Sequence, residues 1–314
     1  MEIFPQVLLS GASGMVGGAL RRSLEEQKVQ YAMLVRRAPK PETSTIFWNP
    51  YASGKQPVLQ MDIRRMEGMR AAIHLSGENL GEGRWTPVKK KRMWESRVTT
   101  TRALVNLLSL LQSPPEVLVC ASAVGIYGDR GDEVLTEDSA AGKGHLAELC
   151  TAWEQAADLA RQRGIRVVHL RLGMVLGKNG GALAKMQPLF RWGMGGRMGS
   201  GRQWMSWISL EDVVRVVDRV LADTSLSGPV NTVAPQPVTN AEFTQTLAHV
   251  LHRPALAPVP AFALRAAFGE VADALLLAST RVLPARLQQV GFSFQHPTLE
   301  AALQAALTPG PADA

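Results

Sequence analysis

The sequence predicts an α/β protein with a doubly wound parallel sheet and a smaller, mostly helical C-terminal region. Three observations lead to this fold class. Short apolar segments alternate with helical patterns over the first two-thirds of the 314 residues. The first apolar segment, Val7–Ser10, runs straight into a turn with the spacing Gly11-x-x-Gly14-x-x-Gly17. Beyond Gly173 the sequence becomes rich in glycine and then returns to helical patterns.

The glycine turn is predicted to receive a pyrophosphate, because each glycine has a task there. Gly11 would let the backbone turn tightly, and Gly14 would let phosphates approach the main chain. Gly17 would let the following helix, Met15–Glu26, pack close to the sheet. The free N–H groups and the dipole at the helix start favour an anion. A Rossmann dinucleotide site is therefore expected here, and a glycine-rich turn without a ligand is the alternative.

Two strands are predicted after the first helix, over Tyr31–Val35 and Ala71–Ser76, because both runs are apolar and short. The link between them is polar and rich in proline. It should hold a third strand, for which Val58–Ile63 is the candidate, since Trp48–Gln56 is typical of an irregular loop.

Alternation continues through the middle of the chain. A long helix is predicted over Lys89–Leu111, where apolar residues recur at helical spacing before Pro114 and Pro115 end it. The next elements are a strand over Val117–Ser122, a helix over His145–Arg163 that Gly164 ends, and a strand over Val167–Leu172.

The last third differs in composition. Glycines are frequent over 177–201, and apolar helical stretches lie around 262–268 and 272–278. Ser209-x-x-Asp212 resembles a capping box ahead of a helix over 213–222, and Thr239-x-x-Glu242 matches one ahead of a helix over 243–251. We divide the chain into a dinucleotide-binding domain over 1–235, with a substrate-side insertion at about 177–208, and a C-terminal substrate-side region over 236–314.

Composition excludes several functional classes. The net charge of +7 includes the basic run at 89–92, but no recognition module accompanies it, so we expect no nucleic-acid partner. No signal peptide and no run of about 18 apolar residues is present, so we expect no membrane partner. The six histidines are scattered, which predicts no metal site. Two cysteines, Cys120 and Cys150, give no disulfide framework and fit a reducing cytoplasm.

The end of the second strand indicates which dinucleotide is bound. A carboxylate here would bind the ribose hydroxyls of NAD, but the strand ends in Arg36 and Arg37. Guanidinium groups bind phosphate bidentately and stack on adenine, so the pair predicts NADP(H). Two surface arginines without a ligand are the alternative.

Several motifs together resemble the extended short-chain dehydrogenases/reductases. They are the glycine turn, Leu75-Ser76-Gly77-Glu78-Asn79, Ser96-Arg97-x-x-Thr100-Thr101 and the segment from Ser122 to Asp129. The segments at 153–154, 171–177, 199–208 and 239–243 are similar to an atypical epimerase-family subgroup, the SDR39U1-like (YfcH-like) proteins with a C-terminal extension. The resemblance covers nearly the whole chain.

The resemblance implies a set of cofactor contacts. The turn would hold the pyrophosphate, and Arg36 with Arg37 the adenosine phosphate. Leu75, Ser76 and Gly77 would line the ribose side. Arg97, which stands where many relatives have asparagine, would touch the cofactor, and Val175 would lie near the nicotinamide. The expected contacts in the turn itself are Gly11, Ala12, Ser13, Gly14, Met15, Val16 and Gly17.

The chain departs from the superfamily at the acid/base pair. Reductases of this kind carry Tyr-x-x-x-Lys, but alignment on Glu154 puts Leu146 and Cys150 at those two positions. The candidate catalytic hydroxyls are therefore Ser122 and Tyr127. A serine that satisfies the backbone and a tyrosine that only lines the site are the alternatives.

Two functions follow from this combination. The leading hypothesis is an NADP(H)-dependent, epimerase-like oxidoreductase acting on an unidentified small molecule. The alternative is a catalytically weak NADP(H)-binding regulatory or scaffold protein, connected by resemblance with cell division. The resemblance also allows a homodimer through the faces of Leu104–Leu111 and Leu149–Ala160, which would otherwise be covered core.

Overall fold

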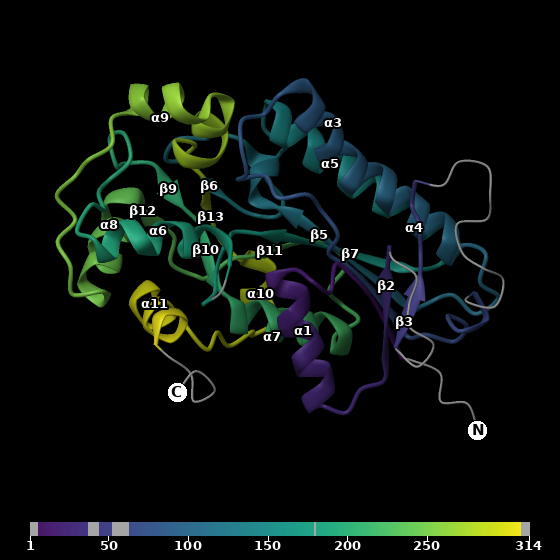
Figure 1. Cartoon of the computed structure of the whole chain (residues 1–314). Helices are drawn as coiled ribbons and strands as arrows, with labels where there is room; N and C mark the ends of the chain where they lie inside the picture. The colour runs from purple at the N-terminus through teal and green to yellow at the C-terminus, as the bar shows by residue number, and fades with distance from the viewer. Residues whose placement is uncertain (1–5, 37–43, 52–62, 179, 309–314) are drawn as a thin grey trace.

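A computed structural model describes residues 6–36, 44–51, 63–178 and 180–308. Seven parallel strands form one sheet in the order β11-β7-β5-β4-β1-β2-β3 (Figure 1). The doubly wound parallel sheet predicted from the sequence is confirmed. The strands are β1 (Val7–Ser10), β2 (Tyr31–Val35), β3 (Thr45–Phe47), β4 (Ala71–His74), β5 (Val117–Ala123), β7 (Arg166–Leu172) and β11 (Gly228–Thr232).

The direction in which the sheet is built reverses between β1 and β4. From β1 the chain adds β2 and β3 on one side and then returns to place β4 on the other side of β1. Ser10 is paired with His74 in this register, so both strands end at the same level. In open α/β sheets the crevice beyond the carboxyl ends at such a reversal is where ligands bind.

Helices cover both faces of the sheet. α1 (Met15–Glu26) and α7 (Leu210–Ala222) lie on one face, and α4 (Thr100–Leu108) and α5 (His145–Asp158) on the other (Figure 1). Alternate residues of the short strands enter the two separate cores, and both sides of β1 are therefore buried. This double burial explains why the strands appear in the sequence as continuous apolar runs.

The predicted position of the third strand is wrong. β3 is Thr45–Phe47, which pairs with β2 through Met33 and Thr45 and buries Ile46 completely. Of the expected strand over Val58–Ile63, residues 58–62 lie outside the described residues, and Ile63 is helical. Three residues with a β-branched centre are enough for an edge strand, but too few to give a clear periodic signal.

The long helix predicted over Lys89–Leu111 is interrupted. α3 (Pro87–Trp94) is followed by a π-helical segment, Glu95–Thr99, and then by α4, which ends at Leu108. The apolar spacing continues through the interruption, so the pattern could not show it. π-helical segments inside α-helices are frequent at functional sites.

The other predicted elements of this half are confirmed. α5 continues as a 3-10 turn over Leu159–Arg163, and Gly164 ends it with a φ of +74°. Leu104 and Leu149, from the two faces considered for dimer contacts, are buried in the core of the chain itself.

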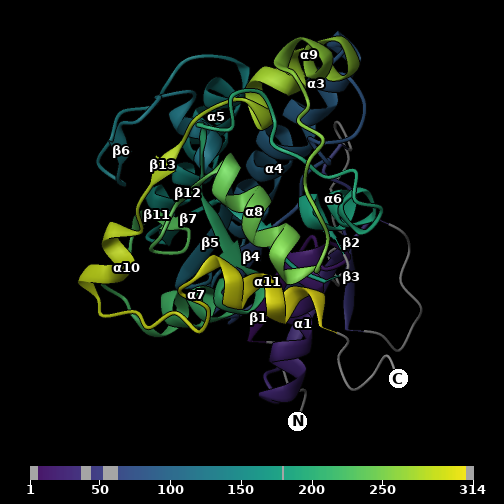
Figure 2. The same ribbon diagram turned by 90° about the vertical axis from the view of Figure 1, so that its left-hand side faces the viewer.

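Beyond β11 the chain is mostly helical, and its helices α8 and α11 lie side by side (Figure 2). Ser209 caps α7, and the capping box of Thr239 and Glu242 begins α8, as predicted. No helix in the described ranges is both long and apolar enough to cross a membrane. The remaining elements are β6 (Val134–Leu135), β8 (Met174–Leu176), α6 (Gly181–Arg191), β9 (Trp204–Met205), β10 (Trp207–Ser209), β12 (Val238–Thr239), α8 (Asn240–Val250), α9 (Ala261–Phe268), β13 (Arg281–Val282), α10 (Ala285–Gln289) and α11 (Leu299–Leu307).

Candidate functional site

The glycine turn lies at the sheet reversal and is closely packed. Gly11 has a φ of +79°, and a Cβ there would lie 2.7 Å from the carbonyl carbon of Leu75, which follows β4. A Cβ on Gly17 would lie 2.2 Å from the carbonyl oxygen of Gly11. Two of the three glycines are therefore required by backbone contacts alone, with or without a ligand.

The third glycine leaves the start of α1 open. Gly14 is the N-cap of α1, so no side chain caps the helix, and the first turn holds no acidic residue. A Cβ on Gly14 would meet only the Gly11 carbonyl, at 3.4 Å. N–H groups that lack a capping acceptor form a site for an anion, which the helix dipole also favours. Ala12, Ser13 and Val16 belong to the same turn and first helical turn, of which Ser13 is exposed.

Arg36 follows the last residue of β2, the strand next to β1, and its side chain is exposed. It is free to reach a group bound beyond the carboxyl ends of β1 and β2. Arg37 lies outside the described residues.

A buried polar chain supports the loop after β4. The Ser76 hydroxyl donates to Ser10 Oγ at 3.1 Å, and Ser10 Oγ lies 2.5 Å from His74 Nδ1. His74 is fully buried, and burial lowers its pKa to about 4. The imidazole is therefore neutral at pH 7, and its tautomer sets the direction of the hydrogen bond between Nδ1 and Ser10. This chain ties β1 and β4 together below the glycine turn.

Arg97 reaches the same loop from the π-helical segment. Its Nη2 donates to the carbonyl oxygen of Glu78 at 2.9 Å, and its guanidinium lies over the Trp153 ring at 5.2 Å. A Cβ on Gly77 would be 3.1 Å from Arg97 Cζ. The predicted residues Leu75, Ser76, Gly77 and Arg97 therefore lie together beyond the carboxyl end of β4.

Val175 belongs to a wall on the other side of the turn. Met15, the first residue of α1, packs against Gly177 and Gly180 of the segment that follows β8. A Cβ on Gly181 would also be 3.3 Å from the carbonyl oxygen of Val175. These contacts place the end of β8 beside the start of α1. The position of Val175 near a nicotinamide stays a prediction.

α6 is joined to the loop after β4 by one hydrogen bond. Lys185 Nζ donates to the carbonyl oxygen of Gly81 at 2.9 Å. Sequence reasoning did not single out Lys185, because a lone lysine in an amphipathic helix gives no functional signal.

Ser122, near the end of β5, is engaged by a buried ion pair. Its hydroxyl donates to Glu154 Oε1 at 2.7 Å. Arg171 binds the same carboxylate in a bidentate manner, with Nε to Oε1 at 2.9 Å and Nη2 to Oε2 at 2.9 Å. This geometry fixes both carboxylate oxygens and raises the pKa of Arg171, whose charge burial would otherwise disfavour.

Tyr127 is the next member of the same network. Its hydroxyl accepts a hydrogen bond from Arg171 Nη1 at 2.9 Å and lies 2.7 Å from Asn231 Oδ1. The side chain is completely buried, and burial raises its pKa. Both candidate catalytic hydroxyls therefore donate to acceptors inside the protein, Ser122 to Glu154 and Tyr127 to Asn231. Glu154 and Arg171 belong to two of the segments that carry the family resemblance. Only the fold shows that their side chains meet.

The positions of the usual tyrosine and lysine are filled by core side chains. Leu146 and Cys150 are 8% and 3% exposed. Burial raises the pKa of Cys150 to about 12, so its thiol stays protonated and unreactive at neutral pH. Cys150 therefore acts here as a small buried apolar residue.

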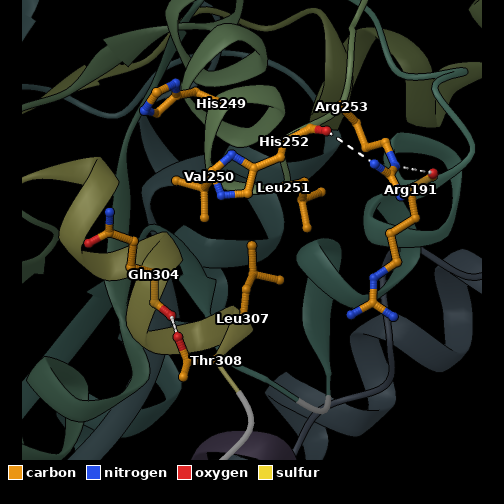
Figure 3. Close-up of a pocket in the computed structure, with 9 residues that line it drawn as sticks. All are labelled: Arg191, His249, Val250, Leu251, His252, Arg253, Gln304, Leu307 and Thr308. Atoms are coloured by element: carbon orange, nitrogen blue, oxygen red, sulfur yellow. Dashed lines mark hydrogen bonds between the residues drawn. The ribbon is translucent and has the colours of Figure 1, made fainter.

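A separate surface pocket of about 540 Å³ lies between the ends of α8 and α11 (Figure 3). Among its lining residues, Arg253 Nε donates to the Arg191 carbonyl, and the Thr308 hydroxyl donates to the carbonyl of Gln304. None of the lining residues is predicted to contact the cofactor, so we do not assign the cofactor to this pocket. Among the residues with described positions, no cluster of side chains suited to a metal ion is found.

Family models match most of the chain. Residues 7–233 match the NAD dependent epimerase/dehydratase family, and residues 259–306 match a domain of unknown function, DUF1731. The first match covers the parallel sheet and the glycine turn, and the second covers the helical C-terminal end.

Relatives of full length support the same assignment. Epimerase family protein Mb2239 of Mycobacterium bovis is 42% identical over 302 residues, which are 96% of this chain and 97% of that protein. An Arabidopsis thaliana protein, the chloroplastic SDR39U1 homolog, is 38% identical over 95% of this chain and 86% of its own length. A crystal structure of human epimerase family protein SDR39U1 with NADPH has a TM-score of 0.84 and 32% identity, and the match covers 96% of this chain and 98% of that one.

Proposed function

This chain belongs to the NAD-dependent epimerase/dehydratase family, and from that membership we propose that it is an NADP(H)-dependent, epimerase-like oxidoreductase of a small-molecule substrate. One observation carries the proposal. The open N-terminus of α1 lies at the sheet reversal, where Gly11 fits against Leu75 so closely that no side chain could be added. Such a turn offers unpaired N–H groups to a pyrophosphate.

The proposed preference for NADP(H), which carries a 2′-phosphate, over NAD(H) rests on the residues at the end of β2. Arg36 is exposed there, Arg37 follows it in the sequence, and neither position offers the carboxylate that would bind an NAD ribose. The human relative was crystallised with NADPH, which agrees with this choice.

The nicotinamide, when bound, supplies or accepts a hydride. The residues of the chain would then orient and enclose it. Ser76 is held by Ser10, Val175 borders the start of α1, and Lys185 joins α6 to the loop after β4. The Ser122 hydroxyl donates to Glu154, and the Tyr127 hydroxyl accepts from Arg171 and donates to internal oxygen atoms, which favours a positioning role for both over direct proton transfer.

Fluorescence titration of the purified chain with NADPH and with NADH tests the proposal. We expect tight NADPH binding, which should fall at least tenfold in a double variant, Arg36→Ala with Arg37→Ala. Arg102→Ala, an exposed arginine of α4, is the matched control and should bind as the unchanged protein does.

Equal binding of both dinucleotides would refute the phosphate preference, and no binding would refute the cofactor site. A panel of carbonyl compounds then tests hydride transfer by loss of NADPH absorbance. NADPH binding without turnover across the panel would favour the regulatory alternative over the oxidoreductase.

A further inference from the structure

Arg97 holds a buried positive charge that no carboxylate of the described residues contacts in an ion pair. The side chain is 8% exposed, and burial lowers its pKa. Among the described residues it forms no ion pair, and its polar contacts are the carbonyl of Glu78 at 2.9 Å and the hydroxyl of Ser96 at 3.4 Å. A guanidinium has five N–H donors, so several remain for another acceptor.

The nearby carboxylate is already bound elsewhere. Glu78 Oε1 lies 2.8 Å from Lys89 Nζ and 3.3 Å from Arg92 Nε. Glu78 therefore gives Arg97 its backbone carbonyl, while its carboxylate neutralises residues of α3. The local charge around Arg97 is consequently positive.

A second buried arginine of the same half shows what a structural guanidinium looks like here. Arg171 is equally buried, at 8% exposure, but binds Glu154 through two hydrogen bonds of 2.9 Å. Its pKa is raised, whereas that of Arg97 is lowered. Leaving a buried charge unpaired is costly, and such sites in enzymes commonly serve a ligand.

The position of Arg97 adds a second, independent observation. Cys150 occupies the place of the usual lysine on α5, and Arg97 lies 5.2 Å from the ring of Trp153, three residues further along the same helix. The π-helical segment Glu95–Thr99 directs Arg97 to the loop after β4, where Gly77 leaves room for the guanidinium. At this level α5 offers a buried thiol, and the π-helical segment beside it offers a guanidinium.

We propose that Arg97 is an oxyanion-binding residue at the inner end of the crevice, in the place of the missing lysine. Its ligand is either a carboxylate of the substrate or the nicotinamide-side phosphate of the cofactor. Both groups present the paired oxygens that a guanidinium binds bidentately. The inference rests on the proposed function, because it assumes that the crevice holds a dinucleotide and its substrate.

Four variants of the full chain test this assignment. Arg97→Met removes the charge at similar length, Arg97→Gln keeps donors without the charge, and Arg97→Lys keeps the charge without the planar fork. Arg102→Met, on the exposed face of α4, is the matched control. Thermal unfolding without ligand is recorded first, and Arg97→Met should unfold at the same temperature or higher, because an unpaired buried charge is gone.

Binding is then measured with two pairs of probe sets, each consisting of an anionic set and its neutral counterpart. Oxalate, malonate and succinate are compared with their neutral diamides, with and without NADP⁺, and nicotinamide mononucleotide is compared with nicotinamide riboside. The unchanged protein should prefer the anionic member of one pair at least tenfold. Arg97→Met and Arg97→Gln should abolish that preference, Arg97→Lys should retain part of it, and Arg102→Met should leave it intact.

The pair that responds identifies the source. Loss of the carboxylate preference indicates the substrate, and loss of the mononucleotide preference indicates the cofactor phosphate. The assignment is overturned if Arg97→Met and Arg97→Gln keep both preferences, or if they lower the unfolding temperature while binding is unchanged. NADPH binding by the unchanged protein is read separately, so failure of the cofactor site and failure of the Arg97 assignment are distinguishable.

Discussion

The carbonyl oxygen of Gly11 lies 2.2 Å from the point that a Cβ on Gly17 would occupy. No adjustment of a side chain can relieve such a contact, because both partners are backbone atoms. The first turn of α1 is therefore held against the end of β1 at a distance that only glycine permits. This closeness brings the open helix N-terminus to the level where β1 and β4 end.

We predict that Gly17→Ala destabilises the protein by at least about 2 kcal/mol, because the added methyl must displace the turn. Gly18→Ala is the matched control: its Cβ would meet no atom within 3.8 Å, and alanine favours the helix. Gly14→Ala should fold normally but weaken NADPH binding, since its methyl projects where phosphates would approach. Urea unfolding and NADPH titration of the three variants check these expectations, which equal stability of Gly17→Ala and Gly18→Ala would contradict.

Removal of the Glu154 charge should be severely destabilising. Glu154→Gln leaves the Arg171 guanidinium buried without a counter-charge, and breaking a buried pair in this way costs about 3–5 kcal/mol. Tyr127→Phe removes a hydroxyl that bonds with Arg171, Asn231 and the Thr136 carbonyl, and should cost about 1–3 kcal/mol. Chemical denaturation measures both values.

The same pair of variants tests the role of the network. Tyr127→Phe should retain most hydride transfer at temperatures where it stays folded, because a positioning role leaves the proton step intact. A loss of turnover by several orders of magnitude in a stable Tyr127→Phe protein would instead show that its hydroxyl is catalytic.

Sequence patterns predicted the parts of this fold that depend on local chemistry. The glycine turn, the capping residues Ser209 and Thr239, and the helix end at Gly164 each require a residue type at one position, and all were found in place. Strands buried on both faces are also conspicuous as apolar runs.

The missed features depend on contacts between distant segments. Glu154 and Arg171 are 17 residues apart and meet only because α5 packs beside β7. The π-helical segment keeps the apolar spacing of its neighbours, and β3 has only three residues. None of these leaves a periodic trace in the sequence, so they could not be predicted from it.

His74 should make the protein sensitive to acid. Burial lowers its folded pKa to about 4 from 6.5, so the unfolded chain binds a proton that the folded chain refuses between these values. The contribution of His74 to the free energy of unfolding is fully present above about pH 6.5. It is lost as the pH falls toward 4, and the loss amounts to roughly 3 kcal/mol in total. The free energy of unfolding measured from pH 7.5 to 4 should show this slope.

His74→Gln isolates that contribution, because glutamine can still form a hydrogen bond with Ser10 but does not titrate in this range. Its pH dependence should be shallower than that of the unchanged protein by up to one proton. His252→Gln, an exposed histidine of similar size, should leave the slope as it was. Parallel curves for His74→Gln and the unchanged protein would mean that His74 is not held neutral.

The last prediction concerns the proposal that Arg97 takes the place of the lysine usually found at the position of Cys150 on α5. Restoring lysine by Cys150→Lys should not rescue the usual machinery, since it buries a second positive charge beside the first. Cys150→Ala, which keeps the site neutral, should cost about 1–2 kcal/mol for the lost thiol contacts. Cys150→Lys should cost several kcal/mol more, because an unpaired ammonium is placed where the side chain is 3% exposed.

A double-variant cycle separates repulsion from burial. If Arg97 provides the charge at this point, Arg97→Met with Cys150→Lys should be more stable than the sum of the single changes predicts, by about 1–3 kcal/mol. Cys150→Ala combined with Arg97→Met should be additive, because alanine has no charge to repel. Additivity in the lysine cycle, measured by urea unfolding at pH 7, would show that the two side chains do not share one site, and the replacement of the lysine by Arg97 would then be wrong.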